Sequence, residues 1–263
     1  MKRRKVLSLL AIAVVAGLGP MVATELLFRP PTAQASSTLL VSAAASLQEA
    51  LKTIEPRFAQ SNPNIKLTYN FGASGTLQQQ IERGAPVDIF LSAAQKQMNT
   101  LQQKGLILPE TRRNLLTNRL VLIVPQNSAL GLTGFRQLVN VKKIAVGEPR
   151  SVPVGQYAEE VFKNLGLLDS LKAKFVFGSN VRNVLAAVES GNVDAGVVYA
   201  TDAKLSSRVK RVATAPTTLH SPIVYPIAVL KDSKNTAVAK TYAQFLSSDT
   251  AKNVFLKFGF ITP

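Results

Sequence analysis

Short apolar runs alternate with amphipathic stretches along the chain from about residue 36 onward. The apolar runs are rich in Val, Ile, Leu and Phe, as β-strands are. They are mostly continuous rather than alternating with polar residues, which indicates strands buried on both faces of a sheet. The predicted strands cover residues 38–43, 65–71, 87–93, 120–125, 143–147, 174–178, 194–200, 211–215 and 223–230.

Between these runs the apolar residues recur at helical spacing, and several of the stretches end in glycine, as helices tend to. The predicted helices cover residues 47–60, 76–84, 94–105, 155–166 and 181–191. Strands that alternate with helices indicate an α/β fold. We therefore expect mainly parallel sheets with helices on both faces.

The first 35 residues have a different composition from the rest. Four basic residues (2–5) precede an apolar run over residues 6–19, and a polar stretch follows that ends in Ala33-Gln34-Ala35. This order is typical of an export signal with an A-x-A cleavage site, here near Ala35. The apolar run is shorter than the roughly 20 residues that a membrane span needs, but an uncleaved anchor remains an alternative.

The chain has no cysteine, so we expect neither disulfides, nor thiolate metal sites, nor a lipid-modified N-terminal cysteine. An exported protein without a lipid anchor needs an outer membrane to retain it. The sequence therefore predicts a periplasmic protein.

The 263 residues carry a formal net charge of +16. Residues 1–35 hold five basic and one acidic residue, which leaves +12 for the remainder. Such a surface attracts anions. The basic residues are scattered, aromatic residues are not interleaved with them, and no nucleic-acid recognition motif is present. We expect no nucleic-acid partner.

A chain of this length can form two lobes, and no long linker follows the signal. Two lobes would have to be joined by short crossings, for which the apolar segments near 118–125 and 223–230 are candidates. We expect lobe I to comprise residues 36–119 and 224–263, and lobe II residues 120–223.

Four strand-to-helix junctions share small residues, hydroxyls or a proline at the first helical turn. They are AAASL (43–47), GASGTL (72–77), EPRSVPVGQYA (148–158) and SNVRNVL (179–185). In open α/β sheets ligands bind at such junctions, and helix N-termini bind anions. The alternative is ordinary helix capping: Ser46 with Glu49 completes a capping-box pattern. The sequence leaves both interpretations open.

A pocket of hydroxyls, amides and a phenol would donate hydrogen bonds but accept few. It would suit an anion that carries no proton at neutral pH, such as sulfate or molybdate, because bound phosphate retains a proton and needs an acceptor. Asp88 and Glu148 are the nearest candidate acceptors, although capping or salt-bridge roles suit both better.

These motifs, together with GVVYATDA (196–203) and YPIAVL (225–230), make the chain similar to the periplasmic molybdate-binding proteins of ABC uptake systems. The resemblance extends over nearly the whole chain after the signal, in order and at similar spacing. It implies the two-lobe periplasmic binding-protein fold of the second topological type, which closes on its ligand by a hinge.

The resemblance also implies a set of ligand-binding residues. Ser46 and Ser74 would each offer a hydroxyl and a backbone N–H. Val154 and Val181 would offer their backbone N–H groups, and Tyr199 its phenol. Molybdenum would be held as molybdate through its oxygens, without a direct bond from the metal to the protein.

The chain departs from the family's pattern at two positions, with Gly75 where relatives can have serine and Asn183 where some have glycine. A subset of relatives adds carboxylates to the metal, but none stands immediately before Pro153. The resemblance therefore favours a four-coordinate tetrahedral anion. It does not rank molybdate against tungstate.

The resulting prediction is a monomeric solute-binding protein that delivers molybdate, and tungstate too, to an ABC permease in the inner membrane, with no cofactor. One alternative is a binding protein for another oxyanion such as sulfate. A second is an enzyme on the same scaffold, but the single histidine, His220, has no nucleophile motif nearby and triad or zinc chemistry lacks its residues. We expect no catalytic activity.

Overall fold

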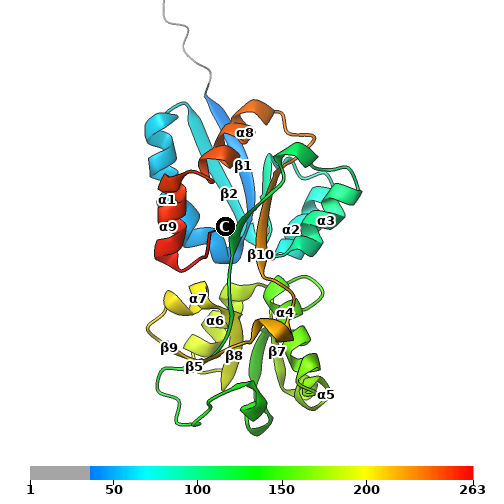
Figure 1. Cartoon of the computed structure of the whole chain (residues 1–263), viewed down its shortest axis with the longest axis vertical. Helices are drawn as coiled ribbons and strands as arrows, with labels where there is room; N and C mark the ends of the chain where they lie inside the picture. The colour runs from blue at the N-terminus through cyan, green and yellow to red at the C-terminus, as the bar shows by residue number, and fades with distance from the viewer. Residues whose placement is uncertain (1–35, 263) are drawn as a thin grey trace, which may run out of the picture. The chain divides into compact units, whose positions relative to one another are not determined.

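The computed structural model describes residues 36–262, whose ten strands form two five-stranded sheets (Figure 1). The first sheet has the strand order β2-β1-β3-β10-β4 and the second the order β7-β6-β8-β5-β9. The strands are β1 (Ser37–Ala44), β2 (Ile65–Gly72), β3 (Ile89–Leu91), β4 (Arg113–Thr117), β5 (Leu120–Pro125), β6 (Ile144–Gly147), β7 (Phe175–Gly178), β8 (Ala195–Tyr199), β9 (Val209–Thr214) and β10 (Val224–Val229). Each predicted strand is present, and β4 is an addition.

Helices connect and cover these strands. They are α1 (Gln48–Ser61), α2 (Ser74–Glu82), α3 (Gln95–Gln103), α4 (Pro153–Asn164), α5 (Leu168–Leu171), α6 (Val181–Glu189), α7 (Ala200–Lys204), α8 (Thr236–Phe245) and α9 (Asp249–Phe258). Short 3-10 helices lie at η1 (Ala45–Leu47), η2 (Pro109–Thr111), η3 (Phe135–Asn140), η4 (Lys172–Lys174) and η5 (Thr217–Leu219). The five predicted helices correspond to α1, α2, α3, α4 and α6. The α/β fold class is confirmed.

The expectation of mainly parallel sheets is too strong. In each sheet three adjacent strands are parallel, β2-β1-β3 in the first and β7-β6-β8 in the second. The other two strands of each sheet are antiparallel to their neighbours. The chain crosses between the sheets next to four of the strands, β4, β5, β9 and β10. Because these strands are not joined to their neighbours by a strand–helix–strand connection, they need not be parallel to them.

The chain passes between the two sheets twice, once between β4 and β5 and once between β9 and β10. We call the part that carries the first sheet lobe I and the part that carries the second lobe II. Placing their boundaries at 119/120 and 223/224 stays our proposal. The expected signal peptide lies outside the described residues. Within residues 36–262 no helix has both the length and the apolar character to cross a membrane.

Helix α6 illustrates why the pattern forms these elements. Its buried residues Val181, Val184, Leu185 and Val188 follow helical spacing and face the core. The Asn180 side chain accepts hydrogen bonds from two first-turn N–H groups, which caps the helix. The helix thus begins at a fixed position at the end of β7, beside the carboxyl edge of the sheet.

Candidate functional site

The five residues expected to bind an anion come together in the structure. Ser46, Ser74, Val154, Val181 and Tyr199 all line one small cavity of about 10 Å³. The first two belong to lobe I and the other three to lobe II. The cavity therefore lies between the lobes, at the ends of strands where helices begin, as expected for a ligand site of an α/β fold.

Small residues form much of the remaining wall. Ala44, Ala45, Gly72, Ala73 and Ala93 line the same cavity. Because their side chains end at Cβ or are absent, they leave the hydroxyls and backbone N–H groups accessible from the cavity. Two of the three alanines of AAASL, Ala44 and Ala45, thus lie in the wall of this cavity.

The capping-box interpretation of Ser46 is wrong. Ser46 lies inside η1, whose N-cap is Ala44, and neither η1 nor α1 has a side-chain cap. The Ser46 hydroxyl is instead 3.0 Å from the hydroxyl of Tyr225 on β10. The Ser46 side chain is thus hydrogen-bonded to another residue of lobe I, and Ser46 also lines the cavity.

Ser74 is fully buried at the first position of α2, and its hydroxyl is also held from behind. Its Oγ accepts a hydrogen bond of 2.9 Å from the backbone N–H of Ala93. A backbone N–H can only donate, so this contact occupies a lone pair of Oγ. The Ser74 hydroxyl hydrogen therefore remains available to donate into the cavity.

Tyr199 contributes a phenol at the end of β8. Its side chain is 1% exposed, and its hydroxyl has no hydrogen-bond partner among the described residues. Burial, to which neighbouring Tyr225 adds, raises the pKa of Tyr199 well above its ordinary value, so the phenol keeps its proton. A buried donor without a partner costs free energy, and a bound anion would supply the missing acceptor.

Backbone N–H groups at helix starts complete the donor set. Val154 and Val181 occupy the second and first positions of α4 and α6, where N–H groups have no acceptor within the helix. Asn180 Oδ1 takes the N–H groups of Arg182 and Asn183, but that of Val181 stays without a protein acceptor within residues 36–262. The helix dipoles add positive potential at these ends.

Among residues 36–262 no charged side chain lines the cavity. Both carboxylates considered from the sequence have structural roles: Asp88 accepts from the Leu40 N–H at 2.8 Å, and Glu148 pairs with Arg150 at 3.0 Å. Among the described residues no group of three or more His, Cys, Asp or Glu could hold a metal ion. The site can therefore hold an oxyanion by its oxygens with hydrogen-bond donors alone.

The two lobes touch at the rim of this cavity. The Gly75 N–H of α2 donates to the Ser151 carbonyl of lobe II at 2.9 Å. On another side, Arg182 Nε of α6 lies 3.4 Å from the Ala45 carbonyl of lobe I. These contacts hold the donors of both lobes around one point.

Arg182 makes an ion pair with a buried carboxylate rather than lining the cavity. Its Nε is 3.2 Å from Asp202 Oδ1, and the Asp202 side chain is fully buried in α7. Burial raises the pKa of Asp202 from 3.8 to about 6, although the positive charge of Arg182 acts in the opposite direction. Desolvation of this pair therefore exceeds its attraction.

This raised pKa predicts a dependence of stability on pH. Between pH 4 and pH 6 the folded chain binds the Asp202 proton while the unfolded chain has lost it, so the free energy of unfolding falls as the pH rises through this window. This decrease in the free energy of unfolding, about 3 kcal/mol between pH 4 and pH 6, should be absent in Asp202→Asn. Urea unfolding of both proteins at pH 4, 5, 6 and 7 measures it, and parallel pH profiles would contradict the prediction.

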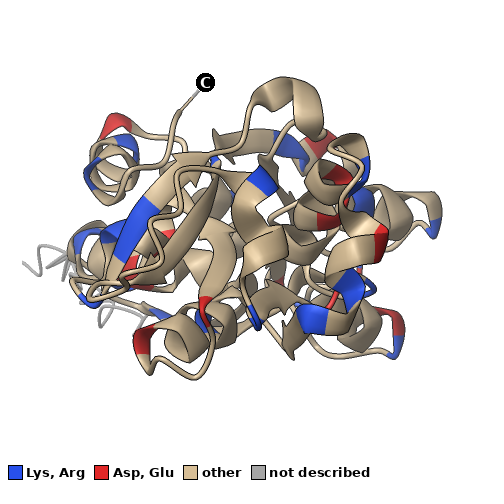
Figure 2. Cartoon of the chain, turned by 90° about the horizontal axis from the view of Figure 1, so that it is seen from below, with Lys and Arg blue, Asp and Glu red and all other residues tan. Residues whose placement is uncertain are grey.

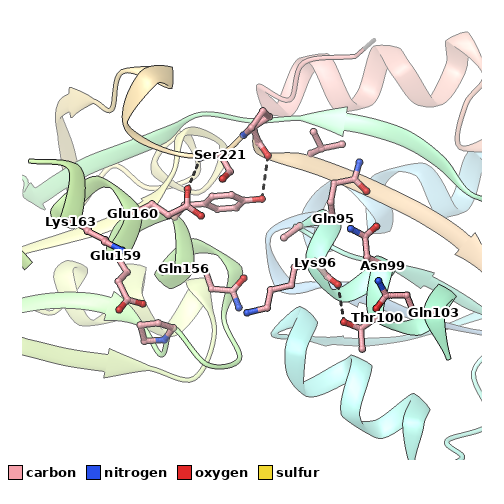
Figure 3. A pocket seen from close by; sticks show the side chains of 15 residues that line it. Gln95, Lys96, Asn99, Thr100, Gln103, Gln156, Glu159, Glu160, Lys163 and Ser221 are labelled. Carbon is pink, nitrogen blue, oxygen red and sulfur yellow. Dashed lines mark hydrogen bonds between the residues drawn. The ribbon is translucent and has the colours of Figure 1, made fainter.

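A much larger cleft, of about 900 Å³, shares no residue with the small cavity. Figure 3 shows side chains of α3, among them Gln95, Lys96 and Asn99, across from Gln156 and Glu160 of α4. Its wall mixes amides with lysines and glutamates, so it has no preference for anions. The hydrogen-bond donors that line the small cavity, and not the volume of the larger cleft, therefore identify the candidate site.

Charge on the outside does not single out one face. Figure 2 shows lysines and arginines on many elements, with aspartates and glutamates among them. Salt bridges such as Lys104–Glu82 and Arg208–Glu189 pair several of them. The net positive charge therefore acts as a general attraction for anions.

Sequence reasoning missed the residues behind Ser46. Tyr225 and Asn118 are both buried, and Asn118 Nδ2 lies 3.3 Å from Tyr225 Oη. YPIAVL marked the position of Tyr225 without giving it a role. Because Tyr225 is 179 residues from Ser46 along the chain, only the folded structure brings the two together.

Comparison with known proteins shows which family the chain resembles. The family described as bacterial extracellular solute-binding protein matches residues 39–261. The molybdate-binding protein ModA of Haemophilus influenzae is 41% identical over 231 residues, which cover 86% of this chain and 91% of that protein. YvgL of Bacillus subtilis, named an ABC transporter substrate-binding lipoprotein, is 45% identical over 223 residues, covering 85% of this chain and 86% of YvgL.

A solved structure shares both the sequence and the fold. It is named as the substrate-binding domain of a molybdenum ABC transporter from Clostridium difficile and is 47% identical to this chain. The two superpose with a TM-score of 0.68 over 87% of this chain and all of that one. The similarity therefore includes both lobes.

Proposed function

Because the chain belongs to the family of bacterial extracellular solute-binding proteins, we propose that it captures molybdate outside the cytoplasm for delivery to an ABC transporter. The observation that carries this proposal is the buried Tyr199 hydroxyl, which makes no hydrogen bond to any described residue and lines a cavity together with two serines and two helix N-termini. Every polar group named there can donate, and no carboxylate is present to accept.

The chemistry of the anion follows from this donor set. Molybdate and tungstate carry two charges and no proton at neutral pH, so each of their oxygens accepts. Hydrogen phosphate carries a hydroxyl that needs an acceptor, and hydroxyls that already donate to its other oxygens have only lone pairs to offer, with no carboxylate beside them among the described lining residues. We therefore propose that molybdate and tungstate bind through Ser46, Ser74, Val154, Val181 and Tyr199, and that phosphate is rejected.

Sulfate has the same charge and no proton, so donors alone do not reject it. Its bonds are shorter, and the proposed filter is size: donors fixed on both lobes would reach the oxygens of the larger anions but not all those of sulfate. We also propose a monomer that works in the periplasm with an inner-membrane permease and needs no cofactor.

Thermal unfolding of the purified protein with molybdate, tungstate, sulfate, phosphate and citrate in turn tests the proposal. A ligand at a hundredfold excess over its Kd adds about 2.7 kcal/mol, or roughly 5–10 °C for a chain of this size. We expect such a shift with molybdate and tungstate only. A shift with citrate or phosphate alone would contradict the proposal, and one with sulfate alone would favour the sulfate-binding alternative.

A further inference from the structure

Two serine hydroxyls line the cavity, and each is held from behind by a different kind of group. Behind Ser74 is the N–H of Ala93, which can only donate. Behind Ser46 is the hydroxyl of Tyr225, which can donate or accept. The direction of the Ser46–Tyr225 hydrogen bond therefore depends on what else Tyr225 contacts.

Asn118, in the crossing between β4 and β5, decides that direction. Its Oδ1 faces the N–H of Arg119 at 2.8 Å, and since a backbone N–H can only donate, the facing atom must be the amide oxygen. The amide nitrogen then points the other way. It donates to Thr201 Oγ1 at 2.9 Å and to Tyr225 Oη at 3.3 Å.

The orientation of the Asn118 amide fixes the Ser46 hydroxyl through Tyr225. The Tyr225 hydroxyl accepts from Asn118 and still carries its own hydrogen, for which Ser46 Oγ, 3.0 Å away, is the other hydrogen-bond partner among the described residues and the one that can accept. Ser46 Oγ accepts there, so its hydrogen is left to donate into the cavity. The phenol is fully buried, so no bulk water competes for these contacts.

We propose that Asn118 and Tyr225 are positioning residues that set the donor direction of Ser46 and thereby help the site to prefer an unprotonated dianion over one that carries a proton. This inference rests on the proposed function. Asn118 and Tyr225 would do for Ser46 what the Ala93 N–H does for Ser74: occupy a lone pair of the serine oxygen, so that the hydroxyl hydrogen is left to donate into the cavity. Neither residue lines the cavity, so both act through Ser46.

The test compares molybdate with hydrogen phosphate at pH 8, where both are dianions, by calorimetric titration. In Tyr225→Phe the Ser46 hydroxyl can rotate and accept from the phosphate hydroxyl. We expect molybdate binding to weaken roughly 3- to 10-fold and the ratio of the two Kd values to move toward phosphate. A merely structural role would weaken both anions equally and leave the ratio unchanged.

Asn118→Asp gives a second variant, with the hydrogen-bond direction reversed. A carboxylate accepts from Tyr225, whose oxygen can then only accept from Ser46, so the Ser46 hydroxyl can donate to Tyr225 and turn a lone pair to the cavity. The added negative charge repels both dianions alike and cancels in the ratio. We expect a larger change of the ratio than in Tyr225→Phe.

Tyr242→Phe is the matched control. Tyr242 is also a fully buried tyrosine of lobe I, and its hydroxyl bonds to that of Tyr69 at 2.7 Å, but it does not line the cavity. We expect wild-type affinity and ratio in this variant. A wild-type ratio in both Tyr225→Phe and Asn118→Asp would overturn the inference, whereas failure of the wild-type protein to bind molybdate would overturn the proposed function itself.

Discussion

Replacing both cavity serines, Ser46→Ala with Ser74→Ala, should weaken molybdate binding by at least roughly 100-fold. Each hydroxyl donates one hydrogen bond to a charged ligand, and such a bond contributes about 1.5–3 kcal/mol. Loss of two such bonds reduces the binding free energy by about 3–6 kcal/mol. Each 1.4 kcal/mol corresponds to a factor of ten in Kd. Calorimetric titration of the double variant measures the loss.

The control is a second pair of serines in lobe I. Ser42 and Ser247 have buried hydroxyls that make no hydrogen bond within the described part of the chain, and neither residue lines the cavity. Ser42→Ala with Ser247→Ala should bind molybdate as the wild type does. An unchanged Kd in the cavity double variant would show that the site is elsewhere.

Gly75→Ala should weaken molybdate binding without weakening the fold. A Cβ on Gly75 would lie 2.6 Å from the Ser151 carbonyl oxygen and 2.8 Å from Ser151 Cα, both in lobe II. The lobes could no longer approach as closely, and the contacts from the far lobe would lengthen. Overpacking of this kind costs about 1–3 kcal/mol, or roughly 5- to 150-fold in Kd.

Two measurements separate closure from folding in this variant. Alanine is a better helix former than glycine by about 1 kcal/mol, so the Tm without ligand should not fall. Gly134→Ala, where a Cβ meets nothing within 4 Å, should change neither Tm nor Kd. If Gly75→Ala bound molybdate as tightly as the wild type, the close approach of the lobes would not be required for binding.

Much of the site could be predicted because local sequence fixes it. Pro153 starts α4 and Asn180 caps α6, so the positions of these two helix starts follow from short motifs. The ends of parallel strands then bring such motifs to one edge of a sheet. The resemblance to molybdate-binding proteins added Val154, Val181 and Tyr199, which the pattern alone would have left as two ordinary apolar helix starts and a core aromatic residue.

The rest depends on contacts between distant segments. The Ser46 hydroxyl could have capped a helix, but the Tyr225 hydroxyl lies within reach of it in the fold. The close approach of Gly75 to Ser151 is equally invisible in either motif. The antiparallel direction of β5, β9 and β10 was missed for a similar reason, because an apolar run does not show in which direction the neighbouring strand runs.

The most direct test of the central claim, that donors alone hold an unprotonated anion, is calorimetric titration with molybdate at pH 8 in two buffers of different ionisation enthalpy. At this pH Asp202, with its pKa of about 6, is ionised, and burial keeps the Tyr199 phenol protonated. We expect one molybdate per chain and the same heat in both buffers, because no proton is taken up or released. A heat that depends on the buffer, or hydrogen phosphate binding as tightly as molybdate, would contradict a site made only of donors.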